Sequence, residues 1–182
     1  MLKIFNKILL TIAFISFVAL LTSCTDNTDN KSNNVNWKQD RDRLEEANRN
    51  LVKQEKEIID DYIKKNNTEY VETGTGLRYR IVNLGDSALI QTGDIITMEY
   101  ELRLLNGKLL YASDNDGLKT FKVGRGGVES GLEEALLHLH RGDEAEIIIP
   151  SYLAHGLTGD GVRIPPKSIL VYKLKIIDNQ KN

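Results

Sequence analysis

The most informative segment of this chain is AHGLTGDGVRIPP, residues 154–166. Its glycines, Gly156, Gly159 and Gly161, tolerate the positive backbone φ angles that tight turns require. The segment ends in Ile-Pro-Pro and is followed at residues 169–177 by a run rich in β-forming side chains. It is therefore predicted to be a hairpin loop that leads into a strand. His155 can donate from its ring, so we expect it either to contact a ligand or to lie at a solvated loop tip.

Working outward, residues 94–105 alternate between apolar and polar side chains, as a half-buried strand does. Asn106-Gly107 then predicts a hairpin turn, because both residues accept positive φ. Further strands are predicted at residues 77–84, 120–123, 145–149 and 169–177, and a short helix at residues 128–138. One helix packed against an antiparallel sheet whose other face is solvent-exposed is an α+β fold. We place this domain at residues 70–178.

The N-terminus is predicted to be a secretory signal at residues 1–23. Lys3 and Lys7 precede an apolar run at residues 8–21, which is too short for an ordinary membrane-spanning helix. The ending Leu-Thr-Ser-Cys resembles a bacterial lipobox, which implies cleavage before Cys24 and a lipid anchor on its thiol. The alternative is a chance cysteine at an ordinary cleavage site. Residues 24–36 are polar and predict a flexible tether in the cell envelope, facing the periplasm from the inner or outer membrane.

Residues 37–67 predict an amphipathic helix, with apolar side chains at intervals of three, four and seven. We expect this stripe either to dock on the following domain or to form a homodimer seam. The third interpretation is a helix that is solvent-exposed on all sides, although this would leave Ile58, Ile59, Tyr62 and Ile63 in water.

Several other functions are disfavoured by composition and spacing. The formal net charge is only −2, so nothing suggests nucleic acid as a partner. His138 and His140 are two residues apart and diverge at a helix end, so we expect no metal site. Residues 124–127 lack the lysine and βαβ setting of a phosphate loop, and Ser151 lacks the Gly-x-Ser-x-Gly elbow of a hydrolase.

The order and spacing of these motifs resemble the FKBP-type peptidyl-prolyl isomerases across residues 77–177. The resemblance is carried by residues 98–102, Asn106-Gly107-Lys108, residues 121–124 and 128–135, Arg141-Gly142-Asp143, the loop at 154–166 and residues 170–172. With its lipobox and N-terminal helix, the chain looks like the FKBP-type lipoproteins of Bacteroidetes, including those associated with gliding motility. The resemblance implies an FKBP-like sheet wrapped on one short helix. It also implies X-Pro segments of exported proteins as partners, and no cofactor.

The resemblance further implies a set of site residues. An apolar cup would be lined by Tyr100, Leu110, Phe121, Val128, Ile164 and Tyr172, with Leu132 at the floor, where tryptophan is common. Glu129 stands where an apolar residue usually offers its backbone N–H to substrate. Tyr100, Tyr111 and His155 are the expected catalytic residues, although Tyr111 replaces an aspartate and His155 a tyrosine of the family pattern. Two functions stay open: a membrane-tethered isomerase for exported proteins, and a catalytically weak binding module. For a depleted isomerase, Tyr111→Asp is expected to raise activity.

Overall fold

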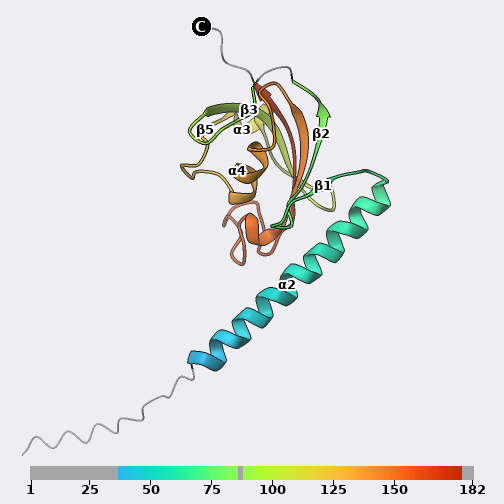
Figure 1. Cartoon of the computed structure of the whole chain (residues 1–182), viewed down its shortest axis with the longest axis vertical. Helices are drawn as coiled ribbons and strands as arrows, with labels where there is room; N and C mark the ends of the chain where they lie inside the picture. The colour runs from blue at the N-terminus through green and yellow to red at the C-terminus, as the bar shows by residue number, and fades with distance from the viewer. Residues whose placement is uncertain (1–36, 86–87, 178–182) are drawn as a thin grey trace, which may run out of the picture. The chain divides into compact units, whose positions relative to one another are not determined.

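The computed structural model describes residues 37–85 and 88–177 (Figure 1). The predicted signal peptide, Cys24 and the tether lie outside the described residues. In chain order the elements are α2 (Trp37–Asn66), β1 (Val71–Glu72), β2 (Arg78–Asn83), β3 (Ile95–Leu104), β4 (Leu109–Ala112), α3 (Ser113–Asp116), β5 (Lys119–Lys122), α4 (Ser130–Leu136), β6 (Glu144–Ile149), the 3₁₀ turn η1 (Ser151–Leu153) and β7 (Leu170–Ile177).

Within the described residues, seven strands form one antiparallel sheet: six follow the order β1-β2-β6-β7-β3-β4, and β5 pairs with β3 off this path. The long strand β3 organises it. One edge of β3 pairs with β7, and the other edge is shared between β5 and β4 (Figure 1). The predicted turn between β3 and β4 is present, because Leu104 N–H donates to the Lys108 carbonyl and Gly107 adopts a φ of 88°. This arrangement leaves α3 and β5 beside the same end of the sheet.

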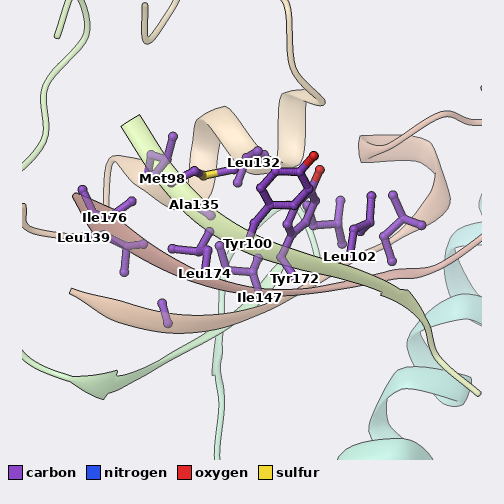
Figure 2. Packing of buried hydrophobic residues seen from close by; sticks show 14 of the residues in the cluster. Met98, Tyr100, Leu102, Leu132, Ala135, Leu139, Ile147, Tyr172, Leu174 and Ile176 are labelled. Carbon is purple, nitrogen blue, oxygen red and sulfur yellow. The ribbon is translucent and has the colours of Figure 1, made fainter. Parts of the chain in front are cut away.

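The core lies between the sheet and α4. Leu132, Ala135 and Leu136 of α4 are fully buried and face the inner side chains of the strands, including Met98 and Tyr172 (Figure 2). The predicted alternation in β3 is confirmed, since Ile96, Met98, Tyr100 and Leu102 are buried whereas the residues between them are partly or fully exposed. The predicted α+β fold, with a short helix on an antiparallel sheet and a long preceding helix, is therefore confirmed.

The second half of α2 docks on the outer face of the sheet. Ile59 is only 1% exposed and packs with Ile148, Ile169 and Val171. The prediction that the outer face of the sheet is exposed to solvent is thus wrong near β6 and β7, because α2 covers the sheet there. The apolar stripe divides, since Leu44 remains 66% exposed and Ile58 50% exposed. Docking therefore accounts for Ile59 and, in part, for Tyr62 and Ile63, and not for Leu44 or Ile58.

Candidate functional site

A cavity of about 740 Å³ opens where the inner face of the sheet meets the start of α4 and the loop after η1. Its lining comes from six separate segments of the chain: Tyr100, Leu102, Tyr111, Asp116, Lys119, Gly127, Val128, Glu129, Ser130, Ala154, His155, Asp160 and Ile164. Apolar and aromatic side chains form the walls, and several charged groups converge on the same space. Such a mixture is typical of a binding site.

The aromatic wall consists of Tyr100, which lines the cavity, and of Tyr172 on the neighbouring strand, which is buried behind the cavity surface. The rings of Tyr100 and Tyr172 lie 6.1 Å apart and are tilted by 47°. The Lys119 ammonium group lies 5.1 Å from the centroid of Tyr100 and 5.7 Å from that of Tyr172, within the range of a cation–π contact. Burial, and then the charge of Asp116, raises the pKa of the Tyr100 phenol. The ammonium group of Lys119 therefore lies against the aromatic wall.

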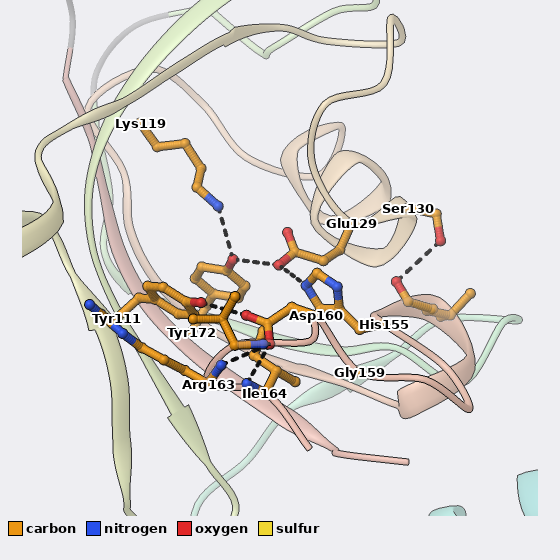
Figure 3. Close-up of polar contacts among 12 residues, drawn as sticks. Tyr111, Lys119, Glu129, Ser130, His155, Gly159, Asp160, Arg163, Ile164 and Tyr172 are labelled. Atoms are coloured by element: carbon orange, nitrogen blue, oxygen red, sulfur yellow. Dashed lines mark hydrogen bonds and ion pairs between the residues drawn. The ribbon is translucent and has the colours of Figure 1, made fainter. Parts of the chain in front are cut away.

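A chain of polar contacts crosses the base of the cavity (Figure 3). The Tyr172 hydroxyl donates to Glu129 Oε1 at 2.9 Å, and Lys119 Nζ lies 3.4 Å from the same hydroxyl. His155 Nε2 lies 3.1 Å from Glu129 Oε1. Burial raises the pKa of Tyr172, and the Glu129 carboxyl group raises it further, so the phenol stays a donor. Glu129 Oε2 is buried without a hydrogen-bond partner among the described residues.

Asp160 organises the loop on the other side of the cavity. Its Oδ1 accepts the backbone N–H groups of Val162, Arg163 and Ile164 at 2.7–2.9 Å, and its Oδ2 accepts the Tyr111 hydroxyl at 2.5 Å. Burial raises the pKa of Asp160, but these hydrogen bonds outweigh it and hold the pKa well below the usual range. Gly159 is required here, because it has a φ of +70° and a Cβ would lie 2.1 Å from the Ile164 carbonyl oxygen.

Arg163 ties this loop to β4 and α3. Its guanidinium lies 4.5 Å from the centroid of the Tyr111 ring and donates to the Leu110 carbonyl at 3.0 Å. It also pairs with Asp116 at 2.9 Å. The backbone N–H of Ala112, and then Arg163, holds the pKa of Asp116 below its usual value, although burial opposes this. Asp160 and Arg163 together place Ile164 at the edge of the cavity.

Residues 87–177 match the family described as FKBP-type peptidyl-prolyl cis-trans isomerase. The chain belongs to this family. It is 34% identical over 129 residues to the probable FKBP-type peptidyl-prolyl cis-trans isomerase FkpA of Neisseria meningitidis serogroup B, an alignment that covers 69% of this chain and 47% of that protein. It is 32% identical over 108 residues to the outer membrane protein MIP of Legionella longbeachae, covering 59% and 46% respectively.

The fold agrees with a solved structure as well. The crystal structure of AtFKBP13 superimposes with a TM-score of 0.58 at 29% identity, covering 60% of this chain and 97% of that one. By contrast, the chain spans about half the length of the two curated relatives. The family match covers residues 87–177 of the sheet domain, and the two relatives extend beyond the part that aligns.

The structure brings six of the predicted FKBP site residues to the cavity: Tyr100, Tyr111, Val128, Glu129, His155 and Ile164. The others lie behind the surface. Leu110 and Leu132 are buried in the core, Phe121 packs against the core from β5, and Tyr172 is fully buried with its hydroxyl on Glu129. Lys119, two residues before Phe121, is the β5 side chain that lines the cavity.

Sequence reasoning did not assign roles to Asp160 and Arg163. The family pattern places a carboxylate directly after Leu110, where this FKBP has Tyr111. In the structure a carboxylate from the loop lies at the end of the Tyr111 side chain, since Asp160 accepts the Tyr111 hydroxyl. The available signal was the Asp160-Gly161 pair, because an aspartate in a turn commonly accepts hydrogen bonds from backbone N–H groups a few residues later.

Proposed function

We propose that this protein is a peptidyl-prolyl cis-trans isomerase that acts on X-Pro segments. The observation that carries the proposal is the cavity itself, in which apolar walls from Tyr100, Val128 and Ile164 surround a backbone donor. That donor is the N–H of Glu129, the N-cap residue of α4, for which the described residues provide no acceptor. Apolar walls beside a backbone N–H that has no acceptor are suited to a proline ring and its neighbouring carbonyl.

The physics of the reaction explains why such a cavity suffices. Rotation about an X-Pro bond has a barrier of about 18–20 kcal/mol, because resonance stiffens the C–N bond. Water favours the charge-separated resonance form, so an apolar cavity weakens the partial double bond. A hydrogen bond that is stronger in the twisted state lowers the barrier further. The reaction uses no nucleophile, and in our proposal Tyr100 and Val128 shield the bond while Glu129 N–H donates.

His155 contributes in a different way from a free donor. Its Nε2–H donates to Glu129 Oε1, so in the neutral ring Nδ1 carries no proton and does not donate to a substrate carbonyl. Tyr111 is similarly engaged with Asp160. In our proposal these two residues shape and orient the loop around the substrate, and Tyr100 provides the ring on which proline packs.

One observation favours a second candidate, a binding module with weak catalysis. The Lys119 ammonium group lies against the ring of Tyr100, which lines the cavity and on which a proline ring would pack, and against the buried ring of Tyr172. Moving a cation away from two aromatic faces opposes substrate binding by about 0.5–2 kcal/mol. A module that binds proline-containing partners weakly in an envelope or motility assembly, and isomerises them slowly, would have this property.

We further propose that the protein is lipid-anchored through Cys24 in the cell envelope, faces the periplasm and assists the folding of exported proteins. The lipobox at residues 21–24 supports this proposal, as does similarity to a relative named as an outer membrane protein. In the described ranges, 37–85 and 88–177, no helix is long and apolar enough to cross a bilayer. Metabolic labelling with a clickable fatty acid tests the anchor, and Cys24→Ala should abolish the label.

The isomerase proposal is tested by NMR exchange on the full chain in mild detergent, with a panel of X-Pro peptides. Tyr100→Ala is the control, because it removes one aromatic wall of the cavity. Activity that disappears in the control supports the isomerase. Background rates from a folded protein that still binds the peptides would favour the binding module.

A further inference from the structure

We propose that Glu55 of helix α2 is a positioning residue for the cavity. Through Glu55, helix α2 would hold the loop that carries His155 in place. Glu55 is only 4% exposed, and both of its carboxyl oxygens bind one residue. Oε2 accepts the Ser151 backbone N–H at 2.7 Å, and Oε1 accepts the Ser151 hydroxyl at 2.5 Å. The inference rests on the isomerase function proposed above.

Ser151 is the first residue of η1, and η1 leads directly into the cavity. The Ser151 carbonyl accepts the N–H groups of Ala154 at 3.0 Å and Gly156 at 2.8 Å. These two residues flank His155, whose ring contacts Glu129. An unbroken series of hydrogen bonds and adjacent residues therefore runs from Glu55 through Ser151 to His155.

The same turn also holds the start of α4. Ser130 Oγ donates to the Leu153 carbonyl at 3.1 Å (Figure 3). Gly131 packs so closely on η1 that a Cβ would lie 3.1 Å from Leu153 Cβ. A displacement of η1 would therefore move both His155 and the residues next to Glu129.

Docking of α2 does not by itself require Glu55. Ile59 already packs on the sheet, and Asp60 forms an ion pair with Arg78 at 3.0 Å. Among the described residues, Glu55 has no cation within ion-pair distance, and a buried carboxyl group is unfavourable unless it accepts hydrogen bonds. The hydrogen bonds that Glu55 accepts come from Ser151, and they hold η1 in place. Glu55 is thus placed to align the loop for the reaction.

The test compares Glu55→Ala and Glu55→Gln with Asp60→Ala in the full chain, at a temperature where circular dichroism shows all variants folded. Asp60→Ala is the matched control, because it removes another acidic docking contact from the same helix without touching η1. We expect Glu55→Ala to lower kcat/KM about tenfold, as misplacement of a site does. Glu55→Gln should recover most of the loss, since its amide oxygen still accepts from Ser151, and Asp60→Ala should stay within about twofold of the wild type.

A second readout is the NMR shift of the His155 imidazole, which requires no activity. It should move in Glu55→Ala and stay in place in Asp60→Ala. An inactive wild type would refute the isomerase, while the His155 shift would still test the positioning. Equal kcat/KM and equal His155 shifts in Glu55→Ala and Asp60→Ala would overturn the proposal. If Glu55→Ala does not fold, Ser151→Ala, which removes one hydroxyl, takes its place in both measurements.

Discussion

Replacing Tyr172 with phenylalanine removes one hydroxyl from the base of the cavity and leaves the ring in place. Tyr172 is fully buried, and its hydroxyl donates to Glu129 Oε1 at 2.9 Å. A hydrogen bond to a charged partner contributes about 1.5–3 kcal/mol. The weaker contact to Lys119, at 3.4 Å, adds little. We therefore expect Tyr172→Phe to lower the free energy of unfolding by about 2 kcal/mol.

The loss should fall mainly on Glu129, whose side chain is 5% exposed. Its Oε2 already lacks a partner, so in Tyr172→Phe only the contact with His155 remains. Replacing both partners with apolar groups is much less unfavourable than orphaning one of them. The double variant Tyr172→Phe/Glu129→Leu should therefore be more stable than the two single changes predict when their effects are added.

Urea unfolding followed by circular dichroism measures this cycle. The denaturation midpoint should fall in Tyr172→Phe at an unchanged m-value, and Tm should fall by about 4–8 °C. The coupling energy between Tyr172 and Glu129 should be about 1.5 kcal/mol or more. A coupling energy below about 0.5 kcal/mol would refute the reasoning, because the two changes would then be independent.

Three further changes test other parts of the site. Lys119→Leu should raise kcat/KM several-fold in NMR exchange with X-Pro peptides, because the cation no longer covers the aromatic wall; a fall would mean that Lys119 helps to bind substrate. Tyr111→Asp should lower Tm and activity, since the new carboxylate would face Asp160, and this reverses the gain expected from the family pattern; higher activity would contradict the observed pairing. The pKa of Asp160 is lowered from 3.8, so the hydrogen bonds of its carboxylate stabilise the folded protein above about pH 4, and this stabilisation is lost as the pH falls further. An NMR titration should show the amides of residues 162–164 shifting at lower pH in the wild type and not in Asp160→Asn.

The fold could be predicted because its signals are local. Alternation in residues 94–105, the Asn106-Gly107 turn and the helical spacing around Leu132 each depend on near neighbours in the sequence. The docking of α2 on both sheet and η1 could not be predicted in the same way. Ser151 and Glu55 are 96 residues apart, and nothing near either residue indicates the other. The helical stripe predicted that α2 would bury a face, without specifying what would cover it.

The site residues were predicted unevenly for a related reason. Tyr100, Val128 and Ile164, which were expected from family position, line the cavity, since their place follows from strand register and loop length. Asp160 was missed, because its role depends on Tyr111, from a strand 49 residues earlier. Considered alone, Tyr111 indicates that the carboxylate of the family pattern is missing. Considered with Asp160, Tyr111 donates a hydrogen bond to a carboxylate that the loop supplies.

The polar groups at the base of the cavity depend on one another in the same way. Glu129 is too buried to be satisfied by water, so it requires the hydroxyl of Tyr172 and the ring of His155. Lys119 then supplies the positive charge beside this group, from β5 at the side of the cavity. Phenylalanine at 172 or leucine at 129 alone would leave a polar partner unsatisfied. Because each departure from an apolar cup is stabilised by the next, the stability of this cluster depends on the four residues together.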